Sequence, residues 1–168
     1  MILSVAILGL VSAQRLGELV VARRNTHRLL AAGGIERGCA HYPVMVALHA
    51  AWLLGLWWQA WDRPARLGWL AAYLVLEVLR VWVLASIGRR WTTRIIVMPG
   101  EALVRRGPYR LIPHPNYLVV AGEIAVLPLV FGLAAYAAVF SLLNAAMLAW
   151  RIRVEDRALA TFRQPGRA

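Results

Sequence analysis

The sequence alternates between long apolar segments and short polar segments rich in arginine. Three apolar segments have about 20 residues, the length that an α-helix needs to cross a bilayer. They are roughly Ile2 to Val21, Pro43 to Trp61 and Leu67 to Ile87. A longer segment, from Tyr117 to Trp150, is divided by Gly132. At ~1.5 Å per residue each half of it rises only about 21 to 27 Å, which predicts a tight hairpin of two short helices.

This pattern predicts an all-α integral membrane helical bundle with five transmembrane helices, the last two forming a short C-terminal helical hairpin. We expect one membrane-embedded domain over residues 1–168. Residues 1–87 would form a three-helix scaffold, and residues 88–168 a long polar loop, the hairpin and the tail. The chain is apolar from Met1 and has no basic leader, so we expect its first span to be retained.

Composition agrees with a membrane location. The chain is 61% hydrophobic, and its eight tryptophans suit anchors at the two membrane interfaces. Its net charge of +11 comes entirely from arginine and lies in short segments between apolar ones, which argues against a nucleic-acid partner. The single cysteine, Cys39, excludes an internal disulfide.

The arginines also predict an orientation. Positively charged loops stay in the cytoplasm. The three richest groups follow the first span, precede the hairpin and form the tail: Arg23, Arg24, Arg28 and Arg37; Arg89, Arg90, Arg94, Arg105, Arg106 and Arg110; Arg151, Arg153, Arg157, Arg163 and Arg167. Five spans with the N-terminus outside place all three groups in the cytoplasm. We therefore predict a multi-pass protein of a bacterial inner membrane with a cytoplasmic C-terminus.

A rigid polar segment precedes the hairpin. Residues 107–117 read Gly-Pro-Tyr-Arg-Leu-Ile-Pro-His-Pro-Asn-Tyr. A proline fixes its own φ and keeps the preceding residue out of the helical region. His114, between Pro113 and Pro115, should therefore be extended, and Pro115 suits the first turn of the helix that follows.

Two polar groups that are distant in the sequence should meet at one membrane face, because the hairpin helices are antiparallel. They come from the start of one helix and the end of the other: His114, Asn116, Tyr117, Arg151, Glu155 and Asp156. Together with a helix N-terminus, these groups suit a zwitterionic ligand. The alternative is a solvated helix end in which Arg151 and Glu155, four residues apart, form an internal ion pair.

This two-part pattern resembles a known family of membrane enzymes. Gly-Pro-Tyr-Arg, His-Pro-x-Tyr, a short hairpin and Arg-x-x-x-Glu-Asp-x-x-Leu (Arg151 to Leu159) are similar to the isoprenylcysteine carboxyl methyltransferases. The resemblance covers about Arg94 to Leu159. It implies S-adenosylmethionine bound at the cytoplasmic face, S-adenosylhomocysteine as product, and a lipophilic acceptor that arrives from the bilayer.

The resemblance also implies roles for individual residues. Residues expected to line the cofactor pocket are Leu103, Val104, Tyr109, His114, Pro115, Asn116, Tyr117 and Glu155. Arg151 would hold the anionic group of the acceptor, and Arg151 and Glu155 are the predicted catalytic residues. The predicted reaction is methyl transfer to an oxygen of a lipophilic carboxylate, enol or phenol.

Three other functions stay open at this point. A phospholipid N-methyltransferase would use the same methyl donor. An NADPH-dependent reductase is a second alternative, because sterol-reductase relatives share the His-Pro-x-Tyr element. The third is a non-catalytic membrane scaffold. Expected partners are a lipophilic or lipid acceptor and membrane lipids, and the oligomeric state is left open.

The N-terminal half carries charges inside its apolar segments: Gln14, Arg15, Glu18, Glu77 and Arg80. Such groups are costly in a membrane and usually face a bundle interior or a cavity. They form either two ion pairs that fix helix packing or, for Glu77 and Arg80, part of the wall that binds the acceptor together with Arg151.

Two histidines, His41 and His49, lie near the start of the second span. Eight residues place them about 80° apart around a helix, but no further cluster of metal ligands accompanies them, so we predict no metal site. Histidines near an acceptor entrance are the favoured interpretation. The stretch from Arg15 to His49 also resembles a bacterial branch of the family, which is associated with O-methylation of long-chain polyketide pyrones and phenols.

Overall fold

The computed structural model describes residues 1–100 and 104–162, with side chains described up to Ala160. Five α-helices account for most of this chain. They are α1 (Ile2–Ala31), α2 (His41–Ala60), α3 (Leu67–Ile87), α4 (Pro115–Val130) and α5 (Ala134–Phe162). Two short 3₁₀ helices, η1 (Gly88–Arg90) and η2 (Gly107–Arg110), and two strands, β1 (Ile35–Arg37) and β2 (Ile95–Val97), complete the described elements.

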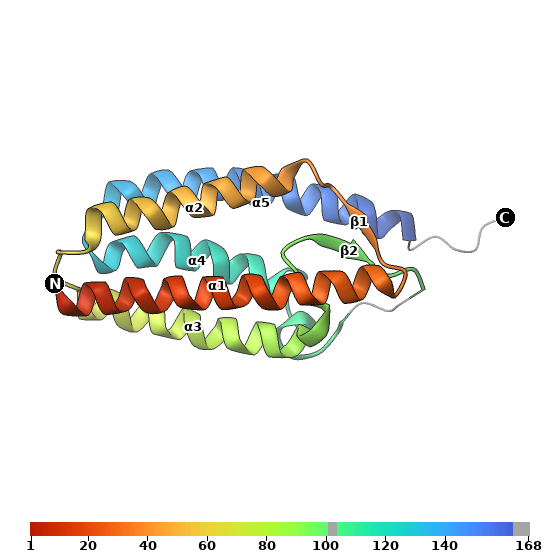
Figure 1. The fold of residues 1–168 in the computed structure, drawn as a ribbon, viewed down its shortest axis with the longest axis horizontal. Coiled ribbons are helices and arrows are strands. Elements are labelled where there is room, and N and C mark those ends of the chain that lie inside the picture. Colours follow the sequence, from red (N-terminus) through yellow and green to blue (C-terminus); the bar gives the residue numbers. More distant parts are fainter. Residues whose placement is uncertain (101–103, 163–168) are drawn as a thin grey trace.

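The five helices lie side by side along the long axis, with β1, β2 and η2 at the end where α1 terminates (Figure 1). Helix α4 packs closely on both α3 and α5, which makes it the centre of the bundle. Its fully buried side chains Ile124 and Leu127 belong to one core with Leu8 and Leu56. Many outward-facing side chains are also apolar, as a lipid environment requires.

Three helices are long and apolar enough to cross a membrane: α1, α5 and α3 extended to Arg90. Helix α4 is apolar but has only 16 residues. Helix α2 has 20 residues, with His41, His49 and Gln59 among them, and it is not one of these three. These three helices indicate a membrane protein. The count of five spans stays a prediction.

The predicted hairpin is present, and Gly132 lies in its turn with a φ of +73°. This left-handed conformation favours glycine. A side chain there would also meet the Arg66 guanidinium, since a Cβ would lie 2.8 Å from Nη2 of Arg66.

Two sequence expectations need correction. The second hairpin helix is not short, because α5 has 29 residues and continues through Arg151 and Glu155. Helix α1 likewise runs ten residues beyond the expected end at Val21. Hydropathy marks only the part of a helix inside the apolar layer. The all-α assignment also missed the antiparallel β1–β2 pair, whose register joins Glu36 to Ile96.

Candidate functional site

The two polar groups flanking the hairpin meet as predicted. Helix α4 begins at Pro115, and His114 before it is non-helical, with a φ of −127°. The residues that come together, here called the polar cage, are His114, Tyr117, Arg151, Glu155 and Asp156. They come from the start of α4 and the C-terminal half of α5.

Tyr117 is the centre of the polar cage. Its hydroxyl donates to Oε2 of Glu155 and accepts a hydrogen bond from Nε of Arg151 at 2.8 Å. The His114 ring stacks on the Tyr117 ring, with 5.2 Å between centroids. The imidazole nitrogens lie 3.7 Å from Glu155 Oε2 and 3.5 Å from Asp156 Oδ1. The cage therefore presents an imidazole, a phenol, a guanidinium and two carboxylates together.

Arg151 joins α5 to three other parts of the chain. Besides Tyr117, its Nη1 donates to the Thr93 carbonyl at 2.8 Å, to Sδ of Met45 at 3.2 Å, and to Nε2 of His41 at 3.4 Å. Its exposure is only 6%. The alternative interpretation, in which Arg151 belongs to a solvated helix end, is therefore wrong, because its side chain is buried and fixed.

The surroundings of His41 disfavour a charged ring. Burial lowers the pKa of the His41 imidazole, and the charge of Arg151 lowers it further. The sequence did not predict His41, Met45 or Thr93 as neighbours of Arg151. These contacts depend on how α2 and the β2 loop pack against α5.

The segment that carries Thr93 is itself held against α2 and β1. Arg94 donates to both carboxylate oxygens of Glu36, at 2.8 and 3.0 Å, and its guanidinium lies over the Tyr42 ring at 4.6 Å. The Tyr42 hydroxyl lies 3.3 Å from Oγ1 of Thr93. The small sheet thus fixes the backbone carbonyl to which Arg151 is bonded.

Of the other predicted cofactor residues, Pro115 and Asn116 lie between His114 and Tyr117 in the chain, and Tyr109 is close enough for the Glu155 charge to act on it. Pro115 is buried, and Val104, Tyr109 and Asn116 are half-buried. The Asn116 Oδ1 atom is buried without a hydrogen-bond partner in the described chain, which leaves an acceptor available to a ligand. Leu103 lies outside the described residues.

Tyr109 should keep its proton across the working pH range. Burial raises the pKa of its hydroxyl to about 12, and the nearby Glu155 charge contributes in the same direction. An unfolded tyrosine loses its proton near pH 10, so folding stability should fall from about pH 10 to about pH 12. A difference absorbance titration of wild type against Tyr109→Phe should show one phenolate that appears near pH 12. Titration near pH 10 would contradict this burial.

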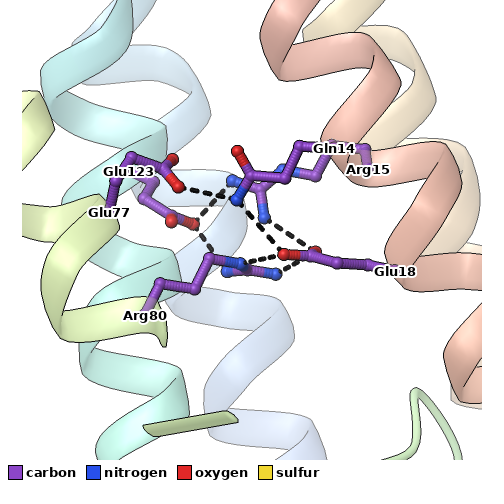
Figure 2. A network of polar contacts seen from close by, with 6 residues as sticks. All are labelled: Gln14, Arg15, Glu18, Glu77, Arg80 and Glu123. Atoms are coloured by element: carbon purple, nitrogen blue, oxygen red, sulfur yellow. Dashed lines mark hydrogen bonds and ion pairs between the residues drawn. The ribbon is translucent and has the colours of Figure 1, made fainter. Parts of the chain in front are cut away.

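A second polar cluster lies deeper in the bundle, here called the interior network. Figure 2 shows its six residues, which point toward one another from three helices: Gln14, Arg15 and Glu18 from α1, Glu77 and Arg80 from α3, and Glu123 from α4. It contains three carboxylates and two guanidinium groups. Glu123 was not predicted as part of this group. The sequence did contain a signal for it, because it is an acidic residue inside an apolar helix.

The interior network is more connected than the two ion pairs that the sequence suggested. Arg15 does pair with Glu18, at 3.1 Å, but it also reaches Glu123 at 2.8 Å. Arg80 donates from Nε and Nη2 to Glu18 and from Nη1 to Glu123, the latter at 2.8 Å. Glu77 instead accepts from the Gln14 amide at 2.6 Å. The network therefore ties α1 to α3 and α4.

This arrangement defines a helical membrane protein with the polar cage at one end of its bundle. The sequence profile described as the isoprenylcysteine carboxyl methyltransferase (ICMT) family matches residues 69–161. Uncharacterized protein YpbQ of Bacillus subtilis (strain 168) is 36% identical over 169 residues, covering 93% of this chain and 96% of that protein. No solved structure matches. The chain belongs to the ICMT family, whose members are membrane methyltransferases that use S-adenosylmethionine.

The residues of the polar cage fit S-adenosylmethionine chemically. Glu155 and Asp156 can accept hydrogen bonds from an ammonium or from ribose hydroxyls, and the unpaired Asn116 Oδ1 is a further acceptor. The start of α4 suits a carboxylate. The aromatic ring of Tyr109 suits a sulfonium, which it attracts through its π-face.

Proposed function

We propose that the protein transfers a methyl group from S-adenosylmethionine to an oxygen of a lipophilic carboxylate, enol or phenol, at the cytoplasmic face of a bacterial inner membrane. One observation carries the proposal. A buried, immobilised Arg151 lies directly beside Tyr117 and, through it, Glu155. A cation that can hold an anionic methyl acceptor thus lies next to oxygen atoms that can accept hydrogen bonds from the methyl donor.

Three residues of the polar cage, and His41 beside it, then have definite tasks. Bound S-adenosylmethionine supplies a methyl group that its sulfonium already activates. Arg151 holds the acceptor oxygen as an anion and aligns it, which accounts for much of the rate in a reaction limited by positioning. Tyr117 and His41 fix the guanidinium in that orientation. Glu155 orients the polar groups of the methyl donor.

Glu77 and Arg80 are proposed to border the acceptor's path. Glu123, which shares the interior network with Arg80, lies six residues beyond Tyr117, about 9 Å further along α4. Arg80 already bonds Glu18 and Glu123 with all three nitrogens. Glu77 makes fewer bonds within the interior network, where it accepts from Gln14, so it is the better candidate for a direct contact.

Glu155→Gln should weaken binding of the methyl donor. The substitution removes the negative charge of the Glu155 carboxylate, which would accept hydrogen bonds from the ammonium or a hydroxyl of the methyl donor. Hydrogen bonds to a charged group contribute about 1.5–3 kcal/mol. We expect the affinity for S-adenosylhomocysteine to fall at least about tenfold in calorimetric titration. Asp62→Asn, a change in the exposed turn between α2 and α3, is the matched control. Equal affinity in the Glu155 variant would remove this residue from the donor site.

The reaction itself is tested by transfer of a labelled methyl group. Detergent-purified protein is mixed with methyl-labelled S-adenosylmethionine and total lipid from the host, and the organic phase is analysed. Label in a base-labile ester or in an aryl or enol ether supports the proposal. Label on a phospholipid amine would favour N-methylation. Binding of NADPH without binding of S-adenosylhomocysteine would favour a reductase, and binding of neither would favour a scaffold.

A further inference from the structure

His49 lies on α2 between the polar cage and the interior network. Its Nδ1 lies 2.8 Å from the carbonyl oxygen of Met45, one turn earlier. A carbonyl oxygen only accepts, so Nδ1 carries the proton in this bond. In the neutral ring, Nε2 is then unprotonated and has a lone pair. The contact with Met45 therefore fixes the tautomer that can act as a base.

The imidazole faces the interior of the bundle. Guanidinium groups from three other helices interact with it electrostatically: Arg15 of α1, Arg80 of α3 and Arg151 of α5. Met45 lies between His49 and the polar cage, because its carbonyl oxygen contacts His49 and its Sδ lies 3.2 Å from Nη1 of Arg151. The ring thus lies on the inner side of α2, close to the residue that is proposed to hold the acceptor oxygen.

The His49 side chain is also accessible. The residue is half-buried, although it faces inward, and the described contacts include a hydrogen bond at Nδ1 only. A histidine that served packing alone would have both polar atoms satisfied or fully enclosed. A base needs a nitrogen that a substrate can reach.

We propose that His49 is a catalytic base that accepts the proton of a hydroxyl acceptor, an inference that rests on the proposed function. The acceptor O–H bond breaks, a new N–H bond forms at Nε2 of His49, and the oxygen keeps the electron pair beside Arg151. The ring becomes an imidazolium. The nearby guanidinium groups disfavour this charged ring, so it gives up the proton readily. The proton leaves to solvent after turnover.

The test compares His49→Gln with wild type on a series of lipophilic phenols of increasing acidity. General-base catalysis contributes about 100-fold or more, so kcat should fall by that amount for weakly acidic phenols. The decrease in kcat should be smaller for acidic phenols, which ionise without a base. Binding of S-adenosylhomocysteine should not change. His27→Gln is the matched control, because His27 is exposed on α1.

A second readout does not need turnover. A long-chain alkyl nitrophenol changes its visible absorption when it ionises. Bound to wild type with S-adenosylhomocysteine, it should ionise at lower pH than when bound to His49→Gln. An unchanged rate across the phenol series, or an unchanged ionisation of the bound nitrophenol, would overturn the role of His49. If wild type methylated no lipid but His49 still controlled nitrophenol ionisation, the proposed function would fail and the base would stand. Failure of both readouts would reject both.

Discussion

Arg151→Ala should reduce methyl transfer to less than about one hundredth of the wild-type rate, as removal of a single oxyanion-stabilising group does in other enzymes. Arg151 is only 6% exposed, and its bonds to Tyr117 and Thr93 fix it in one orientation. Alanine removes the cation that aligns the acceptor oxygen and also leaves the Tyr117 hydroxyl without a donor. Arg151→Lys should recover little, since an ammonium cannot reproduce the planar fork that reaches both partners.

The control for this prediction is Arg153→Ala. Arg153 is exposed on the same helix, two residues away, so it tests loss of an arginine from α5 without loss of the cage. Rates are measured with labelled methyl donor, and folding is monitored by thermal unfolding in detergent. Near-normal transfer by Arg151→Ala would show that the acceptor anion is held elsewhere.

The second large effect concerns stability. Arg80→Met should lower the free energy of unfolding by about 3–5 kcal/mol, the usual cost of removing one partner from a buried ion pair. Arg80 is 5% exposed and is bonded to both Glu18 and Glu123. Its loss leaves three carboxylates against the single guanidinium of Arg15 inside the bundle.

The double variant Arg80→Met with Glu18→Met separates charge balance from packing. It removes one charge of each sign, so it should be more stable than Arg80→Met alone. Arg23→Met, on the exposed face of α1, is the control. Stabilities are compared by equilibrium unfolding in mixed micelles. An unchanged stability of Arg80→Met would mean that the interior network does not hold α1 to α3 and α4.

The meeting of His114 with Glu155 and Asp156 followed from the sequence because it needs only one topological fact. Antiparallel helices bring the start of one to the end of the other, and Gly132 marked the turn. The bounds of α3 could also be predicted from the sequence, since its apolar segment ends before a glycine. In the structure this residue, Gly88, has a φ of +58°.

The partners of Arg151 outside the hairpin could not be predicted in the same way. His41, Met45 and Thr93 approach it only because α2 packs on α5 and a three-residue strand holds the intervening loop. Strands this short carry no periodicity that a sequence can display. The rotation of α1 relative to α3 likewise decides whether Arg80 pairs within its own helix or across to Glu18, and spacing alone does not fix that rotation.

Calorimetric titration of the purified protein with S-adenosylhomocysteine tests the central claim most directly, because every proposed role depends on a methyl donor bound in the polar cage. We predict saturable binding of one molecule per chain, retained in Asp62→Asn and lost or strongly weakened in a His114→Ala, Glu155→Gln double variant. No binding by the wild-type protein, or equal binding by the double variant, would contradict the account.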